Sequence, residues 1–272
     1  AAPAAPAAPT PAAAPRPAAP AAPAPAAGPK KPEGTLSVAY GALADMALLP
    51  RLSSSLDRPQ WDALYDYLTR VDRETRLQPS LATAWEMSPD AKTWTFTIRQ
   101  GVPWHKGEGQ VTAEDVKFSI EQLMLETSKA SHTPLLRRTV DRIETPAPDK
   151  VVIRTKSPAP DLALLFANYH ANPIIPKRYS ERVGEKEAEA KPIGSGSWQF
   201  VARRVGASIT LEAVEGHWRK TSEFKTLRLL VVPETSTRIA SLRTGQVDIA
   251  DVEPQNRKEL EAAGLQVRAL EP

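Results

Sequence analysis

Residues 79–119 constrain the fold more than any other part of the chain. Apolar residues alternate with polar ones over residues 85–87 and again over residues 93–99, and the turn-forming segment Pro-Asp-Ala-Lys at residues 89–92 separates the two runs. Such alternation puts large apolar side chains on one face of a strand. The stretch therefore predicts a β-hairpin with one buried face.

A loop and the start of a helix follow this hairpin. Three glycines within residues 101–109 mark the loop, which carries Trp104 and His105. Residues 112–115, Thr-Ala-Glu-Asp, are typical of a capping box, and the apolar residues after them follow helical spacing as far as residue 124. We expect His105 to be hydrogen-bonded within the loop rather than presented to a ligand. We expect the large aromatic side chains of the stretch to be buried, namely Trp85, Trp94, Phe96 and Trp104.

Four short segments of this stretch occur in a fixed order. They read Pro-x-Leu-Ala-x-x-Trp, Ser-x-Asp-x-x-Thr-x-x-Phe-x-Ile-Arg-x-Gly-Val, Trp-His-x-Gly and Thr-Ala-Glu-Asp-Val-x-Phe-Ser. This order resembles the extracellular solute-binding proteins, family 5, the peptide- and nickel-type binding components of ABC importers. Lys106 departs from the acidic residue usual in the family, and Gly109 with Gln110 lengthens the loop. Both departures concern the loop and not the fold.

The resemblance implies an α/β fold of the periplasmic-binding-protein type, type II. Family members continue for about as long again, so we expect the first lobe with its inserted subdomain, and the second lobe to be absent from this chain. The main α/β lobe would comprise residues 34–60 and 170–272, and residues 61–169 would form the inserted subdomain. Further matches to the family occur near residues 173–179, 191–198 and 241–249.

The first 33 residues cannot contribute to a folded core. They are almost entirely Ala and Pro and hold 11 of the 27 prolines. Proline at this density blocks a continuous helix and favours extended, semi-rigid conformations. We expect residues 1–33 to be a disordered spacer, and a Pro-motif ligand for another protein is the alternative.

Charge and cysteine content exclude several kinds of function. The tail carries three basic residues and one acidic residue, which leaves 32 basic and 31 acidic residues in the rest of the chain. This balance gives no reason to expect a nucleic-acid partner. The chain has no cysteine, so disulfides, thiolate metal sites and cysteine nucleophiles are excluded. No apolar run approaches the ~18 residues that span a bilayer, and the chain is interpreted as a mature or trimmed exported protein.

The remaining sequence alternates between strand and helix patterns. Helices are predicted where apolar residues recur every three or four positions, and strands where β-branched and apolar residues cluster between turn residues. The predicted strands cover residues 35–40, 141–144, 150–156, 197–203, 207–214, 226–232, 246–250 and 265–270. The predicted helices cover residues 61–68, 161–167, 235–244 and 254–263.

The candidate ligand-binding residues come from the ends of these strands. Ligand crevices in open α/β sheets lie at the carboxyl ends of strands, so the loops after residues 35–40 and 246–250 should be neighbours. Asp251 or Glu253 would offer a carboxylate to a cationic group such as a peptide amino terminus. The alternative for the first loop is an ordinary turn after a strand, with no role in binding. The full set of candidate residues is Tyr40, Gly41, Ala42, Trp198, Asp251, Val252 and Glu253.

Gly194 and Gly196 allow the backbone to approach a neighbour closely. That neighbour could be a solute, or the glycines could simply form a tight turn before the strand at residues 197–203. Tyr65 and Tyr67 could likewise contact a ligand, although aromatic residues at helical spacing usually belong to a core.

No catalytic chemistry is expected. The four histidines are isolated from one another, and no nucleophile motif, phosphate loop or dinucleotide fingerprint occurs. Capping accounts for the adjacent Glu114 and Asp115. The resemblance implies a periplasmic or otherwise extracytoplasmic monomer with no cofactor, which binds a peptide or similar polar solute and delivers it to a membrane permease. The alternative is a single lobe with a structural or regulatory role and no solute.

Overall fold

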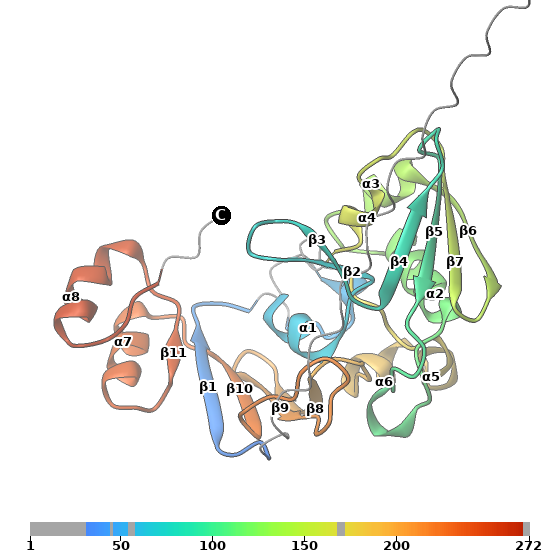
Figure 1. Ribbon diagram of the computed structural model, residues 1–272. Helices are drawn as coiled ribbons and strands as arrows, with labels where there is room; N and C mark the ends of the chain where they lie inside the picture. The colour runs from blue at the N-terminus through green and yellow to red at the C-terminus, as the bar shows by residue number, and fades with distance from the viewer. Residues whose placement is uncertain (1–30, 44–45, 54–57, 168–171, 269–272) are drawn as a thin grey trace, which may run out of the picture.

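The computed structural model describes residues 31–43, 46–53, 58–167 and 172–268. The described residues form a five-stranded sheet, a four-stranded sheet and a two-stranded hairpin (Figure 1). The predicted tail lies outside the described residues except for its last three positions. None of the helices in the described ranges is long and apolar enough to cross a membrane.

The five-stranded sheet is mixed, with the order β11-β1-β10-β9-β8. β1 runs parallel to both β10 and β11, whereas β9 runs antiparallel to β10 and β8. The carboxyl ends of β1, β10 and β11 therefore lie at the same edge of the sheet. The strands are β1 (Thr35–Tyr40), β8 (Trp198–Arg204), β9 (Ser208–Ala213), β10 (Thr226–Val231) and β11 (Ile249–Ala250).

The four-stranded sheet is antiparallel, with the order β4-β5-β7-β6. It contains the predicted hairpin and the predicted strands 141–144 and 150–156, and helix α2 (Ala113–Met124) packs against it (Figure 1). The Thr112 backbone N–H donates to Asp115 Oδ2 at 2.8 Å, which confirms the predicted cap of α2. The strands are β4 (Ala82–Met87), β5 (Thr93–Ile98), β6 (Val140–Ala147) and β7 (Lys150–Thr155). The separate hairpin pairs β2 (Thr69–Val71) with β3 (Leu77–Pro79).

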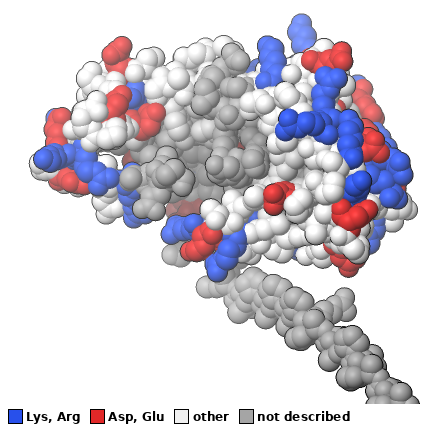
Figure 2. Space-filling view, turned by 90° about the horizontal axis from the view of Figure 1, so that it is seen from above, with Lys and Arg blue, Asp and Glu red and all other residues white. Residues whose placement is uncertain are grey.

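Short helices connect these sheets. They are η1 (Pro50–Leu52), α1 (Arg58–Leu64), η3 (His105–Gly107), α3 (Thr133–Thr139), α4 (Leu162–Leu165), α5 (Lys177–Val183), α6 (Glu185–Ala190), α7 (Thr235–Arg243), η5 (Pro254–Asn256) and α8 (Arg257–Ala262). Acidic side chains are interspersed among the Lys and Arg side chains on the face in Figure 2. Positive and negative side chains are therefore mixed on this face, in keeping with the near-balance of charge in the sequence.

Two hydrophobic clusters form the core. The larger one surrounds β5 and α2 and includes Phe96, which is fully buried. The second lies under the five-stranded sheet and includes Trp61 and Tyr65. Both residues lie at the beginning of the range predicted for the inserted subdomain, 61–169, yet they pack against residues of the five-stranded sheet. The proposed division of the chain at residues 60 and 170 stays a prediction.

Three expectations about local structure differ from the structure. Trp85 is only partly buried, because β4 is the edge strand of its sheet. The predicted strand 246–250 is reduced to two residues, and Ile249 on it is 51% exposed because β11 has a neighbour on one side only. Residues 265–268 are not a strand; they form no ladder with any described strand.

Candidate functional site

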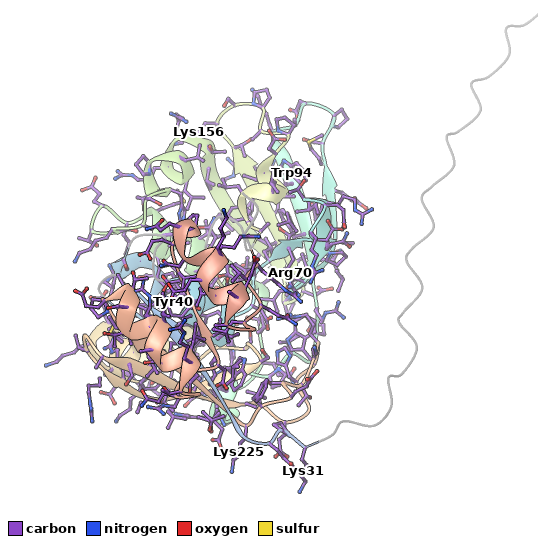
Figure 3. All side chains as sticks on the ribbon, turned by 90° about the vertical axis from the view of Figure 1, so that its left-hand side faces the viewer. Lys31, Tyr40, Arg70, Trp94, Lys156 and Lys225 are labelled. Atoms are coloured by element: carbon purple, nitrogen blue, oxygen red, sulfur yellow. The ribbon has the colours of Figure 1, made fainter. Side chains whose placement is uncertain are left out.

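The two loops predicted to line a cleft meet at the carboxyl edge of the five-stranded sheet. The Gly41 backbone N–H donates to Asp251 Oδ1 at 3.0 Å, and the Asp251 N–H donates to the Ala39 carbonyl at 3.1 Å. The predicted contact between the loops is thus confirmed. Tyr40 is labelled in Figure 3, where α7 and α8 face the viewer. We call residues 40–42 and 251–253 the carboxyl-edge site.

Arg238 on α7 organises this site, and it was missed in the sequence. Its Nη1 donates to the carbonyls of Val232 and Pro233, both at 2.7 Å. Its Nε donates to the Asp251 carbonyl at 2.8 Å and lies 2.9 Å from Asp251 Oδ1. Arg238 therefore joins the loop after β10 to the loop after β11. No feature of the helical pattern distinguishes this buried arginine from the exposed Arg243 on the same helix.

The charges at the carboxyl-edge site are unequally exposed. The Arg238 side chain is 5% exposed, whereas the side chains of Asp251 and Glu253 are 52% and 43% exposed. The Thr235 hydroxyl donates to Glu253 Oε1 at 2.6 Å and lowers the pKa of that carboxyl. Burial, and then the charge of Asp251, raise the pKa of Tyr40. The accessible charges of the site are therefore the two carboxylates, whereas the guanidinium that pairs with them is buried.

Gly41 is fixed by this packing. A Cβ atom at position 41 would lie 3.1 Å from Arg238 Nη1. A side chain at position 41 would therefore crowd the guanidinium, which would have to shift by a few tenths of an ångström to admit it. Ala42 and Val252 also belong to the carboxyl-edge site. Ala42 is exposed, and Val252 is partly buried.

Trp198 lies away from the carboxyl-edge site. It starts β8, at the opposite edge of the sheet from β11, and pairs with Ala213. The register from β8 through β9 and β10 puts Trp198 at the level of the amino-terminal end of β1. Its side chain is 9% exposed and packs in the second hydrophobic cluster. A ligand contact by Trp198 stays a prediction that this position does not support.

Gly194 and Gly196 approach the carboxyl end of α1 rather than the carboxyl-edge site. A Cβ atom at Gly194 would lie 1.8 Å from the Leu64 carbonyl oxygen, and the Gly196 N–H donates to that same oxygen at 2.9 Å. His105 holds the other side: its Nε2 lies 2.8 Å from the Gly196 carbonyl, and the Gly194 N–H donates to Nδ1 at 3.2 Å. These glycines therefore let their backbone pack closely against the end of α1.

A second buried polar group secures the same segment. Asp66 accepts hydrogen bonds from Trp218 Nε1 and Arg219 Nη2, both at 2.9 Å, and from the Ser195 hydroxyl at 3.1 Å. Burial opposes ionisation of Asp66, but its hydrogen bonds and the positive charge of Arg219 hold its pKa below the ordinary value. These contacts tie the segment between α1 and β2 to Ser195, Trp218 and Arg219.

The fold defines an α/β lobe with an inserted antiparallel subdomain and a polar carboxyl edge, the class of the solute-binding lobes. The chain belongs to the bacterial extracellular solute-binding proteins, family 5: the sequence model of the middle segment of that family matches residues 76–270.

Three relatives illustrate the similarity. A dipeptide-binding protein of Escherichia coli K12 is 28% identical over 64% of this chain and 36% of its own length. The periplasmic oligopeptide-binding protein OppA of Haemophilus influenzae is 26% identical over 68% of this chain and 37% of its own. A structure of MoaA from A. tumefaciens R10 in complex with mannopinic acid is 24% identical, with a TM-score of 0.77 over 85% of this chain and 48% of that one.

The chain spans less than half the length of these relatives. The described residues correspond to one lobe with its subdomain, as expected.

Proposed function

We propose that this chain is the solute-binding lobe of an ABC importer's substrate-binding component, which captures peptides or similar polar solutes outside the cytoplasmic membrane. The observation that supports this most is the pair of half-exposed carboxylates at the carboxyl edge, where ligands bind in open α/β sheets. The peptide-binding relatives named above support the choice of solute class.

In this proposal the site works by preorganisation. Arg238 ties the loop after β11 to the loop after β10, and Asp251 holds Gly41 of the loop after β1, so less conformational entropy is lost on binding. Asp251 and Glu253 then receive the ammonium or amide N–H groups of the solute. A second lobe that closes over the solute would remove the remaining water and add the contacts that set specificity.

The alternative is a lobe that takes a structural or regulatory part in the envelope without binding solute. The pairing of Asp251 and Glu253 with Arg238 favours it, because carboxylates that already have a partner within the protein can serve the fold alone.

Chemical-shift mapping of the 272-residue chain with a tripeptide at millimolar concentration separates the two proposals. Solute binding predicts saturable shifts of the amides of Gly41 and Asp251. An absence of shifts at these amides up to the solubility limit would support the structural alternative.

A further inference from the structure

A cavity of about 270 Å³ lies where the inserted subdomain meets helices of the main lobe. It is lined by η1, by one face of α2, by residues 173–175 and by α5 and α6. In Figure 1, α5 and α6 lie to the right and β11, α7 and α8 to the left. The cavity is therefore separate from the carboxyl-edge site.

The body of the cavity is apolar. Leu49, Leu123, Ile175 and Ala188 line it and are each less than 10% exposed, and the partly buried Phe118 lies beside them. The volume exceeds the roughly 150 Å³ of a dry apolar cavity that holds benzene. The space accommodates one aromatic ring with a short substituent.

One end of the cavity is charged. Arg51 reaches it with a side chain that is 15% exposed, and it pairs with Glu185 and donates to the Thr127 hydroxyl at 3.3 Å. Glu181 on α5 also lines the cavity, and among the described residues it forms no ion pair. The lining as a whole therefore contains two carboxylates and one guanidinium, an excess of negative charge.

We propose that this cavity is a second binding site, for a small hydrophobic amine. The ring or branched aliphatic body occupies the space between Phe118, Leu123 and Ala188. The ammonium group pairs with Glu181, an exposed carboxylate whose charge otherwise acts on Lys177, one turn earlier on α5. A carboxylate on the same body is disfavoured, since it would meet two like charges. This proposal does not depend on solute binding at the carboxyl-edge site.

Three probes with similar bodies test the proposal on the 272-residue chain: 2-phenylethylamine, ethylbenzene and 3-phenylpropionate. We expect 2-phenylethylamine to bind saturably, with a dissociation constant on the order of 1 mM given its size. Methyl NMR signals of Leu123 and Ile175 should shift with the amine and with ethylbenzene. The carboxylate should bind several-fold more weakly than the amine.

Two substitutions localise the binding. Ala188→Phe fills the cavity and should abolish the shifts with all three probes, and Ala202→Phe on the exposed face of β8 is the matched control. Glu181→Gln should weaken the amine roughly two- to fivefold, as for an exposed ion pair, and leave ethylbenzene unchanged. Glu121→Gln, on α2 outside the cavity lining, should affect neither probe.

The proposal is overturned if no probe shifts the Leu123 and Ile175 methyls of the parent chain, a result that requires no variant to fold. Equal affinity for the amine and the carboxylate would also overturn it, because the charge argument would then be wrong. Amide shifts at Gly41 and Asp251 instead of the cavity methyls would place the amine at the carboxyl-edge site.

Discussion

His105 shows at the residue scale how a loop side chain can be held neutral. Its ring is buried, one nitrogen accepts from the Gly194 N–H and the other lies against the Gly196 carbonyl. Desolvation is the main cause that lowers its pKa to about 4. An unfolded chain binds a proton at this residue below about pH 6.5, but the folded chain does so only near pH 4.

Stability should therefore fall as the pH decreases from 6.5 towards 4, by at most about 3 kcal/mol from this group. Urea unfolding of the parent and of His105→Gln at pH 7 and pH 4.5 measures the effect. The variant lacks the titrating ring, so its stability should change less between the two pH values. Parallel losses in both proteins would show that His105 is not responsible.

Neighbouring backbone atoms leave no room for a side chain at Gly194. Gly194→Ala would place Cβ 1.8 Å from the Leu64 carbonyl oxygen, and backbone atoms cannot yield as a flexible side chain does. We expect a loss of roughly 2–4 kcal/mol or a failure to fold. Gly216→Ala is the control: its φ of 68° carries strain but its surroundings are open, so a loss of only about 1 kcal/mol is expected. Equal losses in chemical denaturation would contradict the close-contact explanation.

At the scale of elements, the antiparallel sheet distinguishes a central strand from an edge strand. Trp94 on β5 is 5% exposed, and the centroid of its ring lies 6.0 Å from that of Phe96 in a stacked arrangement. Trp85 on the edge strand β4 is only partly buried. Trp94→Ala should cost roughly 3–5 kcal/mol of unfolding free energy. Trp85→Ala should cost clearly less. The opposite order in thermal and urea unfolding would contradict the strand order.

The carboxyl edge depends on one buried side chain of α7. Arg238→Met removes the donor to the carbonyls of Val232 and Pro233, so we expect Gly41 and Asp251 amides to exchange faster with solvent. The unfolding free energy should fall by roughly 2–4 kcal/mol. Arg243→Met, on the same helix and 48% exposed, should change either quantity little. Unchanged exchange at Gly41 in Arg238→Met would show that this arginine does not hold the loop.

Local interactions could be predicted from the sequence and distant ones could not. The hairpin at residues 82–98 and the cap at Thr112 follow from neighbouring residues, and both occur. The partner of Asp251 is Gly41, 210 positions away, and only the family resemblance and the rule for strand ends suggested that they meet. Arg238 escaped notice because three of its hydrogen bonds go to backbone carbonyls, which every sequence contains.

The short strand β11 illustrates the same limit. Its apolar residues predicted five strand positions, but a strand with one neighbour forms only the ladder that β1 offers it, at two positions. For Gly194 the sequence allowed either a tight turn or a close approach to a neighbour, and it did not show that the neighbour is α1.

At the scale of the whole molecule, we propose that the carboxyl edge of the lobe receives a cationic group. The five-stranded sheet carries this edge, and the inserted subdomain packs at the other side of the lobe (Figure 1). The edge is preformed by Arg238, so its affinity should depend on the carboxylates rather than on a rearrangement of the loops.

The most direct test compares the affinity of a peptide with a free amino terminus for the parent chain and for Asp251→Asn combined with Glu253→Gln. Calorimetric or NMR titration should show binding weakened by about 1–3 kcal/mol in the double variant, and an N-acetylated peptide should not distinguish the two proteins. Amide spectra should confirm that the variant keeps its fold. Unchanged affinity of the free peptide in the folded double variant would contradict the account and remove these loops from the site.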